Sequence, residues 1–174
     1  MSRELLLLRH AKSDWDATYS SDFERPLAKR GKRDAPKVGA WLYREGLVPE
    51  RIVSSPALRA RDTTLKICKA IDYKKKHICW EPRLYEASQA DLIHFLQQYH
   101  TAPRCFLVVG HNPGLEDVVR YLAGADVEEP ADGKLLPTAA MARLEMPDDW
   151  RVLAPGCATL LSITRPRLLE DQAA

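Results

Sequence analysis

Two short, fully apolar segments of the chain lead almost directly into histidines. Leu5–Leu8 is followed by Arg9 and His10. Cys105–Val109 reaches His111 after a single glycine. An apolar run this short, without alternation, is typical of a strand buried on both faces in the middle of a parallel sheet. Because ligands bind beyond the carboxyl ends of such strands, we expect both histidines at one functional edge.

Helical and strand-like patterns alternate along the rest of the chain. In the first helical segment, Pro36 indicates either a kink or the start of a helix that Asp34 caps. Ser55-Pro56 and Ser88 are typical of helix N-termini. The expected strands are 5–8, 52–54, 77–80, 105–109, 139–145 and 158–164, and the expected helices are 27–46, 55–71, 88–99 and 115–123, with a long loop over 12–26. This order predicts a single-domain α/β layered sandwich with a mainly parallel central sheet flanked by helices.

Length and composition are those of one globular domain. The chain has 174 residues, 45% hydrophobic and 29% charged, which is enough for one core. We expect residues 1–174 to form this domain, with a polar tail over about 165–174. The 26 basic and 24 acidic residues leave a net charge of +2, which shows no bias toward nucleic acids. No segment resembles a signal peptide or a membrane span, so we expect a cytoplasmic protein with no membrane partner.

The four cysteines give no sign of a disulfide or a metal site. Cys68, Cys79, Cys105 and Cys157 have no CxxC spacing. Three of them lie in apolar segments, where small buried thiols are common. We therefore assign neither a disulfide nor a metal to them.

A third strand end brings another guanidinium group to the same edge. Residues Ser54–Ala60 pass from a strand into a helix whose first turns carry Arg59. Helix N-termini favour anions, and arginine offers forked donors to phosphoryl oxygens. With Arg9, His10 and His111, this arrangement predicts a pocket for a dianion such as a phosphoryl group.

Five segments, in this order, resemble the histidine phosphatase superfamily. They are Leu8–Ser13, Arg25–Leu27 followed by Arg30-Gly31, Ser54–Ala60, Leu84–Glu86 and Val109–Gly114. Within the superfamily, the compact phosphohistidine phosphatases of the SixA type are most similar. The sequence departs from the pattern at Ala11, where glycine is usual, although alanine is frequent in the SixA-like branch. It also departs at Ala28, where Ser, Thr or Asn often caps the helix, and this concerns only the helix boundary.

The resemblance implies a phosphatase that needs no metal or other cofactor. His10 would attack phosphorus and form a covalent phosphohistidine intermediate, which water then hydrolyses. The cationic side chains would bind the phosphoryl oxygens and stabilise the transition state. The residues implied to contact these oxygens are Arg9, Arg59, protonated His111, Asn112 and Ser13.

The resemblance leaves the role of Glu86 open. Glu86 stands where many superfamily members carry the proton donor to the leaving group. The alternative is a loop carboxylate that pairs with Arg83 or with an active-site arginine. Compact phosphohistidine phosphatases do not all keep an acid there, because a protonated imidazole is already a good leaving group.

The spacing between motifs bears on the substrate. Only 26 residues separate Arg59 from Glu86, and the expected helix, strand and turn take them up. No lid subdomain fits, so we expect an open pocket suited to phosphohistidine on another protein, such as a phosphotransfer or phosphocarrier domain. Oligomeric state is not readable from the sequence.

Three other functions are compatible with part of the pattern. A phosphatase of small phosphoesters or phosphoanhydrides would use the same pocket with another leaving group. A non-catalytic phosphate-binding module would usually lack the nucleophile, whereas His10 is present. A cofactor-dependent mutase is disfavoured, because the chain lacks the inserted segments that enclose a bisphosphate in those enzymes.

Overall fold

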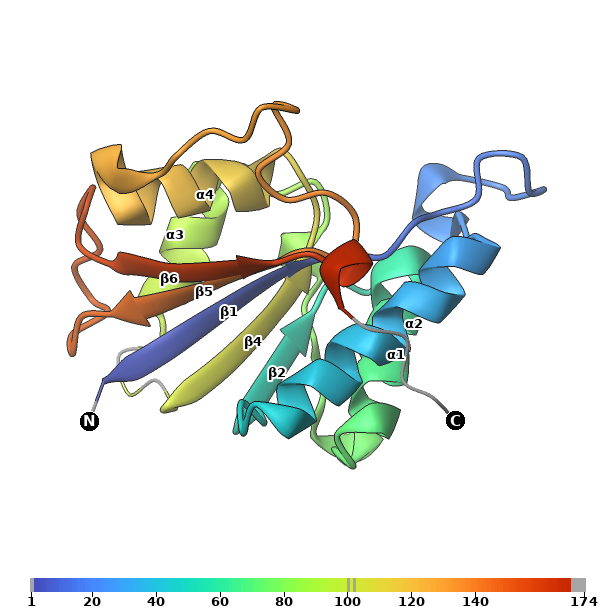
Figure 1. Cartoon of the computed structure of the whole chain (residues 1–174), viewed down its shortest axis with the longest axis horizontal. Coiled ribbons are helices and arrows are strands. Elements are labelled where there is room, and N and C mark those ends of the chain that lie inside the picture. The colour runs from blue at the N-terminus through green and yellow to red at the C-terminus, as the bar shows by residue number, and fades with distance from the viewer. Residues whose placement is uncertain (1, 100, 102, 170–174) are drawn as a thin grey trace.

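The computed structural model describes residues 2–99, 101 and 103–169, and its centre is one six-stranded sheet (Figure 1). The strands are β1 (Arg3–Arg9), β2 (Arg51–Ser54), β3 (Cys79–Trp80), β4 (Cys105–Gly110), β5 (Met141–Met146) and β6 (Thr159–Thr164), in the order β3-β2-β4-β1-β5-β6. β5 pairs antiparallel with β1 and β6, and all other pairings are parallel. The expected α/β sandwich with a mainly parallel sheet is confirmed.

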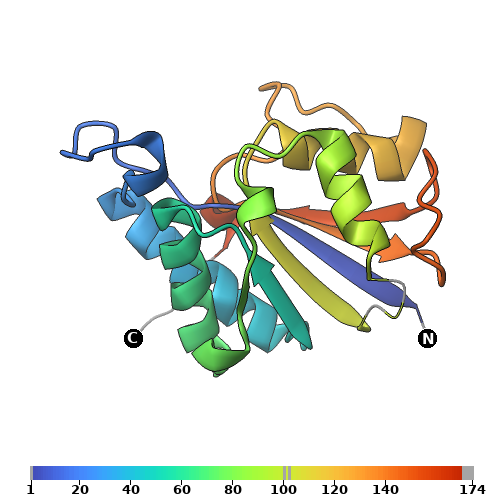
Figure 2. The same cartoon turned by 180° about the vertical axis from the view of Figure 1, so that it is seen from behind.

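Helices cover both faces of this sheet (Figures 1 and 2). They are α1 (Lys29–Arg44), α2 (Leu58–Ala70), α3 (Gln89–Gln97) and α4 (Gly114–Ala123). In β1, Leu5 and Leu7 pack into the core beneath α3 and α4, while Leu6 and Leu8 pack beneath α1 and α2. All four leucines are buried, which explains why this strand has no polar face. None of the helices in the described part of the chain has the length and apolar character needed to cross a membrane.

The first helix excludes one of the two sequence interpretations of Pro36. α1 begins at Lys29 with Ala28 as its N-cap and continues through Pro36, so the predicted start near Pro36 is wrong. Asp34 pairs with Arg30 inside the helix, at 3.8 Å between Arg30 Nε and Asp34 Oδ2, instead of capping a new one. Proline removes only one backbone donor, and the packing of the buried face outweighs this loss.

Two other boundaries also move. α2 begins at Leu58 instead of Ser55, and the Ser55 Oγ accepts a hydrogen bond from the Ala57 N–H at 3.3 Å. The strand expected over 77–80 is reduced to Cys79–Trp80, because a 3₁₀ turn occupies Lys75–His77. The predicted cap at Ser88 is confirmed, since Ser88 and Asp91 form a reciprocal capping box.

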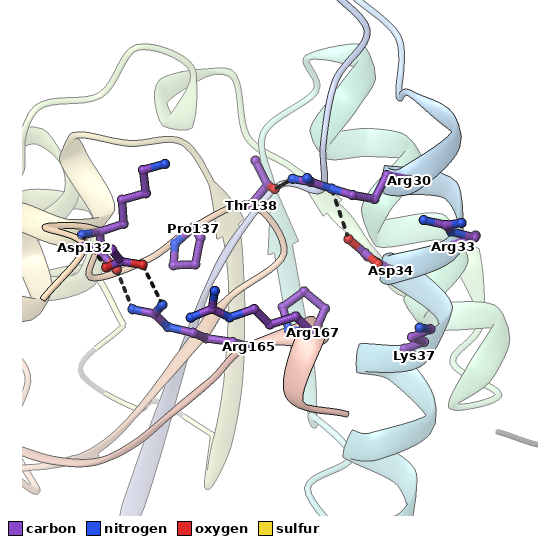
Figure 3. A pocket seen from close by; sticks show the side chains of 11 residues that line it. Arg30, Arg33, Asp34, Lys37, Asp132, Pro137, Thr138, Arg165 and Arg167 are labelled. Atoms are coloured by element: carbon purple, nitrogen blue, oxygen red, sulfur yellow. Dashed lines mark hydrogen bonds and ion pairs between the residues drawn. The ribbon is translucent and has the colours of Figure 1, made fainter. Parts of the chain in front are cut away.

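The segment expected to be a polar tail begins as a packed turn. Pro166–Leu168 form a 3₁₀ turn in which Pro166 is buried. Arg165 donates hydrogen bonds to the Asp132 carboxylate at 3.0 Å and to the Lys134 carbonyl at 2.7 Å (Figure 3). The turn contacts α1. Residues 170–174 lie outside the described part of the chain.

Candidate active site

The carboxyl ends of β1 and β4 bring His10 and His111 together. The strands are parallel neighbours in which Arg9 is paired with Gly110, so both end at one edge of the sheet. The His10 N–H donates to the Gly110 carbonyl at 3.0 Å. The two imidazole centroids lie 5.2 Å apart, with the rings tilted by 52°. The structure therefore places both histidines at one site.

A backbone hydrogen bond fixes the tautomer of His10. Its Nδ1 lies 2.7 Å from the carbonyl oxygen of Ala11. Because a carbonyl only accepts hydrogen bonds, Nδ1 carries the proton and Nε2 keeps a free lone pair. The ring is buried, and this burial, together with the nearby His111 and Arg59, lowers the pKa of His10 to about 3, although the carbonyl contact acts in the opposite direction. His10 is therefore a neutral imidazole near neutral pH.

Arg9 and Arg59 line the same hollow as His10. Arg9 Nη1 donates to the Leu136 carbonyl at 3.2 Å, and both terminal nitrogens of Arg59 donate to Asp22. The Nε atoms of both arginines are buried and have no hydrogen-bond partner. Burial lowers the pKa of Arg9. Buried donors without acceptors are costly, so an anion with several oxygens is a favourable occupant.

One ring nitrogen of His111 has a hydrogen-bond partner, and the other has none. Its Nε2 lies 2.8 Å from the Ser55 Oγ, whereas its Nδ1 is buried without a partner. Burial lowers the pKa of His111 to about 4, and the charge of Arg59 acts in the same direction. The resemblance implies a protonated His111, whereas burial favours the neutral ring. Protonation would need the negative charge of a ligand.

Sequence reasoning missed Asp22, which lies in the 12–26 loop and contacts three active-site neighbours. Its Oδ2 accepts hydrogen bonds from Arg59 at 3.0 Å and from the Tyr85 hydroxyl at 2.8 Å. Its Oδ1 accepts from Arg25 at 3.0 Å. Partial burial raises the pKa of Asp22, but the hydrogen bonds from Tyr85 and Arg25 and the charge of Arg59 outweigh it and hold the value at about 2. Asp22 is thus an internal anion paired with Arg59.

Arg25 connects the end of the 12–26 loop to its beginning, through a contact with Ser13. The guanidinium carbon of Arg25 lies 3.6 Å from the centroid of the Trp15 ring, and one terminal nitrogen hydrogen-bonds the Ser13 hydroxyl. Ser13 lines the hollow as predicted, and its hydroxyl already serves as an acceptor for Arg25. Trp15 is 64% exposed, so its ring covers Arg25 from the solvent side instead of packing into the core.

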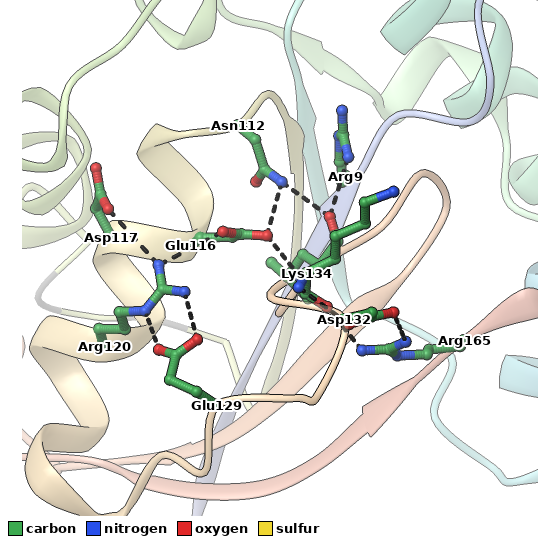
Figure 4. A network of polar contacts seen from close by, with 10 residues as sticks. Arg9, Asn112, Glu116, Asp117, Arg120, Glu129, Asp132, Lys134 and Arg165 are labelled. Atoms are coloured by element: carbon green, nitrogen blue, oxygen red, sulfur yellow. Dashed lines mark hydrogen bonds and ion pairs between the residues drawn. The ribbon is translucent and has the colours of Figure 1, made fainter.

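Asn112 also lines the hollow, but its amide nitrogen is used inside the protein (Figure 4). It donates to Glu116 Oε1 at 3.1 Å and to the Leu136 carbonyl at 2.8 Å. Glu116 Oε1 also accepts from the Leu136 N–H at 2.8 Å. Because the Leu136 carbonyl accepts from Arg9 as well, these contacts hold Arg9 and the loop after α4 in place.

Glu86 lies apart from this cluster. It is exposed, has a left-handed backbone with φ of 56°, and is not among the residues that line the hollow. Its alternative role as the partner of Arg83 is not seen, because Arg83 pairs with Glu81 at 2.9 Å. Tyr85 instead faces the site, with its ring centroid 5.5 Å from that of His111.

The hollow itself is small and open. Its volume is about 160 Å³, and it is lined by Arg9, His10, Lys12, Ser13, Trp15, Arg25, Arg59, His111, Asn112 and Thr138. Cationic and imidazole side chains dominate this lining, so an oxyanion is the chemistry it fits. Across the described ranges, no group of three or more His, Cys, Asp or Glu side chains has an arrangement that could hold a metal ion.

Two proteins are similar to this chain in sequence. The chain is 34% identical over 136 residues to an uncharacterized chloroplastic protein of Arabidopsis thaliana, covering 74% of this chain and 62% of that protein. It thus spans less than two thirds of that relative. It is 33% identical over 165 residues to an uncharacterized protein of Mycobacterium tuberculosis, covering 92% of this chain and all of that protein.

Solved structures have the same architecture. The SixA protein of Agrobacterium tumefaciens superposes with a TM-score of 0.80 at 26% identity, over 95% of this chain and 99% of that one. The protein histidine phosphatase SixA complexed with tungstate gives a TM-score of 0.79 at 22% identity, over 94% and 97%, and shares the fold. Residues 5–92 match the family model of the histidine phosphatase superfamily, branch 1. The chain belongs to the histidine phosphatase superfamily.

Proposed function

We propose that this protein is a phosphatase that removes the phosphoryl group from phosphohistidine on another protein, through a covalent intermediate on His10. One observation carries the proposal. The buried, neutral His10 holds its proton at Nδ1, so Nε2 has a free lone pair beside arginine nitrogens that lack acceptors. A neutral imidazole is a nucleophile, and the surrounding cations attract its anionic target.

The reaction proceeds by two displacements at phosphorus. In the first, the His10 Nε2 lone pair forms an N–P bond while the bond from phosphorus to the substrate imidazole breaks. The electron pair leaves with the substrate nitrogen, and the imidazole departs neutral because its other ring nitrogen carries a proton. In the second, water attacks phosphorus, the bond to His10 breaks, and inorganic phosphate leaves. The sum is hydrolysis of one P–N bond by one water molecule, with His10 restored.

Arg9, Arg59 and His111 stabilise charge during both displacements. The arginine donors bind equatorial phosphoryl oxygens, and their charge is preorganised by the strand and helix that carry them. A bound dianion beside His111 raises the pKa of its imidazole, because an opposite charge favours the protonated form. The unpartnered Nδ1 then becomes a further donor to the phosphoryl group.

The leaving group needs little help from an acid. Phosphohistidine departs as imidazole, which accepts a proton readily, so an exposed Glu86 outside the hollow is not required for this substrate. A phosphoester leaves as an alkoxide and needs a donor. Glu86 could reach such a leaving group only from outside the hollow, so we propose a role for it with esters alone.

The open hollow favours a phosphoryl group displayed on a protein surface. Residues 60–85 form α2, two 3₁₀ turns and the short β3, and no lid occurs among them. The structurally similar SixA protein complexed with tungstate is a protein histidine phosphatase, which agrees with this substrate class. The volume of about 160 Å³ admits a phosphoryl group while leaving its carrier outside.

The test compares two phosphoryl donors in chelator-treated buffer. We would measure phosphate release by mass spectrometry from a histidine-phosphorylated phosphotransfer domain and from an aryl phosphate. Wild-type protein should act on the phosphohistidine domain by preference, and His10→Ala should act on neither. A preference for the aryl phosphate would indicate a small-phosphoester phosphatase, and a rate abolished by the chelator would refute metal independence.

A further inference from the structure

A second, larger groove lies beside the active site (Figure 3). Its volume is about 380 Å³, and one of its walls is α1 while the other comes from the 132–138 loop and the turn after β6. Six cations line it: Arg30, Arg33, Lys37, Lys134, Arg165 and Arg167. Only Asp34 and Asp132 oppose them, so the groove carries four positive charges in excess. The whole chain carries only +2, so the rest of the protein is net negative and the positive charge is concentrated here.

The groove continues from the catalytic hollow. Thr138 lines both of them, and its hydroxyl accepts a hydrogen bond from Arg30 at 3.2 Å. The preceding residue of the same loop, Pro137, forms part of the groove. Arg9 contacts the carbonyl of Leu136 in this loop as well. A chain whose phosphoryl group reaches His10 would therefore pass over Thr138 and along the groove.

The helix that forms one wall, α1, carries cations at its N-terminus, where the helix dipole is already positive. Four of the first five residues of α1 are cations, and its first turn contains no acidic residue. Cations near the positive end of a helix are destabilising. An anionic chain lying along this wall would offset that repulsion.

The spacing of the charges suits an extended polypeptide. Arg30, Arg33 and Lys37 follow one face of α1 over about 10 Å, at 1.5 Å of rise per residue. Arg165 and Arg167 line the opposite wall. A row of cations fits carboxylates repeated along a chain better than it fits one compact anion. Single-stranded nucleic acid would need aromatic side chains for stacking, and no aromatic residue in the described part of the chain lines this groove.

We infer that this groove, defined by α1, the 132–138 loop and the 165–167 turn, docks an acidic segment of the phosphorylated partner protein. The inference rests on the proposed function and adds a specificity to it. Substrates would be selected by acidic residues that flank the phosphohistidine. The groove would mainly raise the rate at which these substrates bind. Exposed charges of this kind change association rates and their salt dependence more than they change chemistry.

The experiment uses two synthetic phosphohistidine peptides, one flanked by Asp and Glu and one by Asn and Gln, together with free phosphohistidine. The groove variant is Arg33→Gln with Arg167→Gln, since both side chains are exposed. The control is Lys32→Gln with Arg104→Gln, which removes the same charge from exposed positions outside the groove. Wild type should prefer the acidic peptide about tenfold in kcat/KM, through KM. The groove variant should lose this preference, and the control should keep it.

The outcomes separate the two proposals. If wild type hydrolyses none of the three substrates, the proposed phosphohistidine function fails. Equal activity on both peptides, or a preference that survives in the groove variant, overturns the acidic docking groove while the function stands. Competition by single-stranded RNA or polyphosphate that exceeds competition by an unphosphorylated acidic peptide, and that disappears in the groove variant, also overturns the polypeptide assignment.

Discussion

Asp22 holds Arg59 twice, through its carboxylate at 3.0 Å and through its own backbone carbonyl at 2.7 Å. These contacts occupy both terminal nitrogens of Arg59 and leave its buried Nε without a partner. Asp22 therefore orients Arg59, and its charge also repels an incoming dianion. The carboxylate is 46% exposed, so water screens part of this repulsion.

The first prediction concerns this internal anion. Asp22→Asn should bind tungstate or phosphate about threefold to tenfold more tightly, because the amide keeps a hydrogen-bond acceptor and removes the negative charge. Isothermal titration calorimetry measures the change. Asp16→Asn, an exposed change in the same loop, should leave the affinity unaltered. Weaker oxyanion binding by Asp22→Asn would show that positioning of Arg59 matters more than repulsion.

The second prediction separates the charge of Arg59 from its geometry. Arg59→Lys keeps a cation but loses the forked donors, so kcat should fall about 100-fold. The substituted protein should still fold, because lysine keeps a cation beside the Asp22 carboxylate at this buried position. Steady-state kinetics with thermal unfolding would check both statements. Arg61→Lys, an exposed position on the same helix, is the matched control. Unchanged kcat in Arg59→Lys would remove Arg59 from the catalytic machinery.

Glu86 gives a third prediction, on leaving-group dependence. Glu86→Gln should change the rate on a phosphohistidine peptide less than twofold, because imidazole needs no added acid. With an alkyl phosphate, the same variant should be about tenfold slower if the carboxyl donates the proton. The ratio of the two effects is the readout. A large loss on phosphohistidine would contradict the account given for the leaving group.

The two active-site histidines should make the fold sensitive to acid. Their pKa values of about 3 and about 4 lie below the ordinary 6.5, so the unfolded chain binds more protons as the pH falls through 6.5. The stabilisation that depends on the neutral histidines should therefore be complete above pH 6.5. Below that pH, the free energy of unfolding should fall steadily toward pH 4. The loss is on the order of a few kcal/mol, at about 1.4 kcal/mol per pKa unit.

Urea unfolding between pH 4.5 and 7.5 would measure this dependence. That range avoids the titration of Asp22, whose pKa is about 2. His10→Asn should flatten the curve, whereas a change at the exposed His77 should not. A slope that His10→Asn leaves unchanged would mean that His10 is not the group that titrates.

The sequence predicts most of the fold because its strands are marked by composition alone. Leu5–Leu8 and Cys105–Val109 are apolar on both faces, and a parallel sheet predicts that their carboxyl ends share one edge. That the two strands are direct neighbours is shown only by the structure. Helix starts are less well marked. Pro36 suggests a boundary that packing overrides, and Ser55 contacts Ala57 and His111 instead of capping α2.

The site residues show the same difference between regular elements, which the sequence marks, and loops, which it does not. His10, Arg9, Arg59 and His111 follow strands or begin helices, so topology alone brings them to one edge. Asp22 lies in a loop without periodicity, where nothing distinguishes it from Asp14 and Asp16. The basic groove was also hidden, because the overall charge is near zero and the groove joins residues more than 100 positions apart. Only the folded chain shows that these cations share a surface.

The central claim is that His10 becomes phosphorylated. The most direct measurement is rapid acid-free quenching of wild-type protein mixed with a histidine-phosphorylated phosphotransfer domain, followed by mass spectrometry under conditions that preserve P–N bonds. We predict a phosphoryl group on His10 that forms and decays within the turnover time and is absent from His10→Asn. Turnover with no phosphoryl group on His10, or with the label on another residue, would contradict the account.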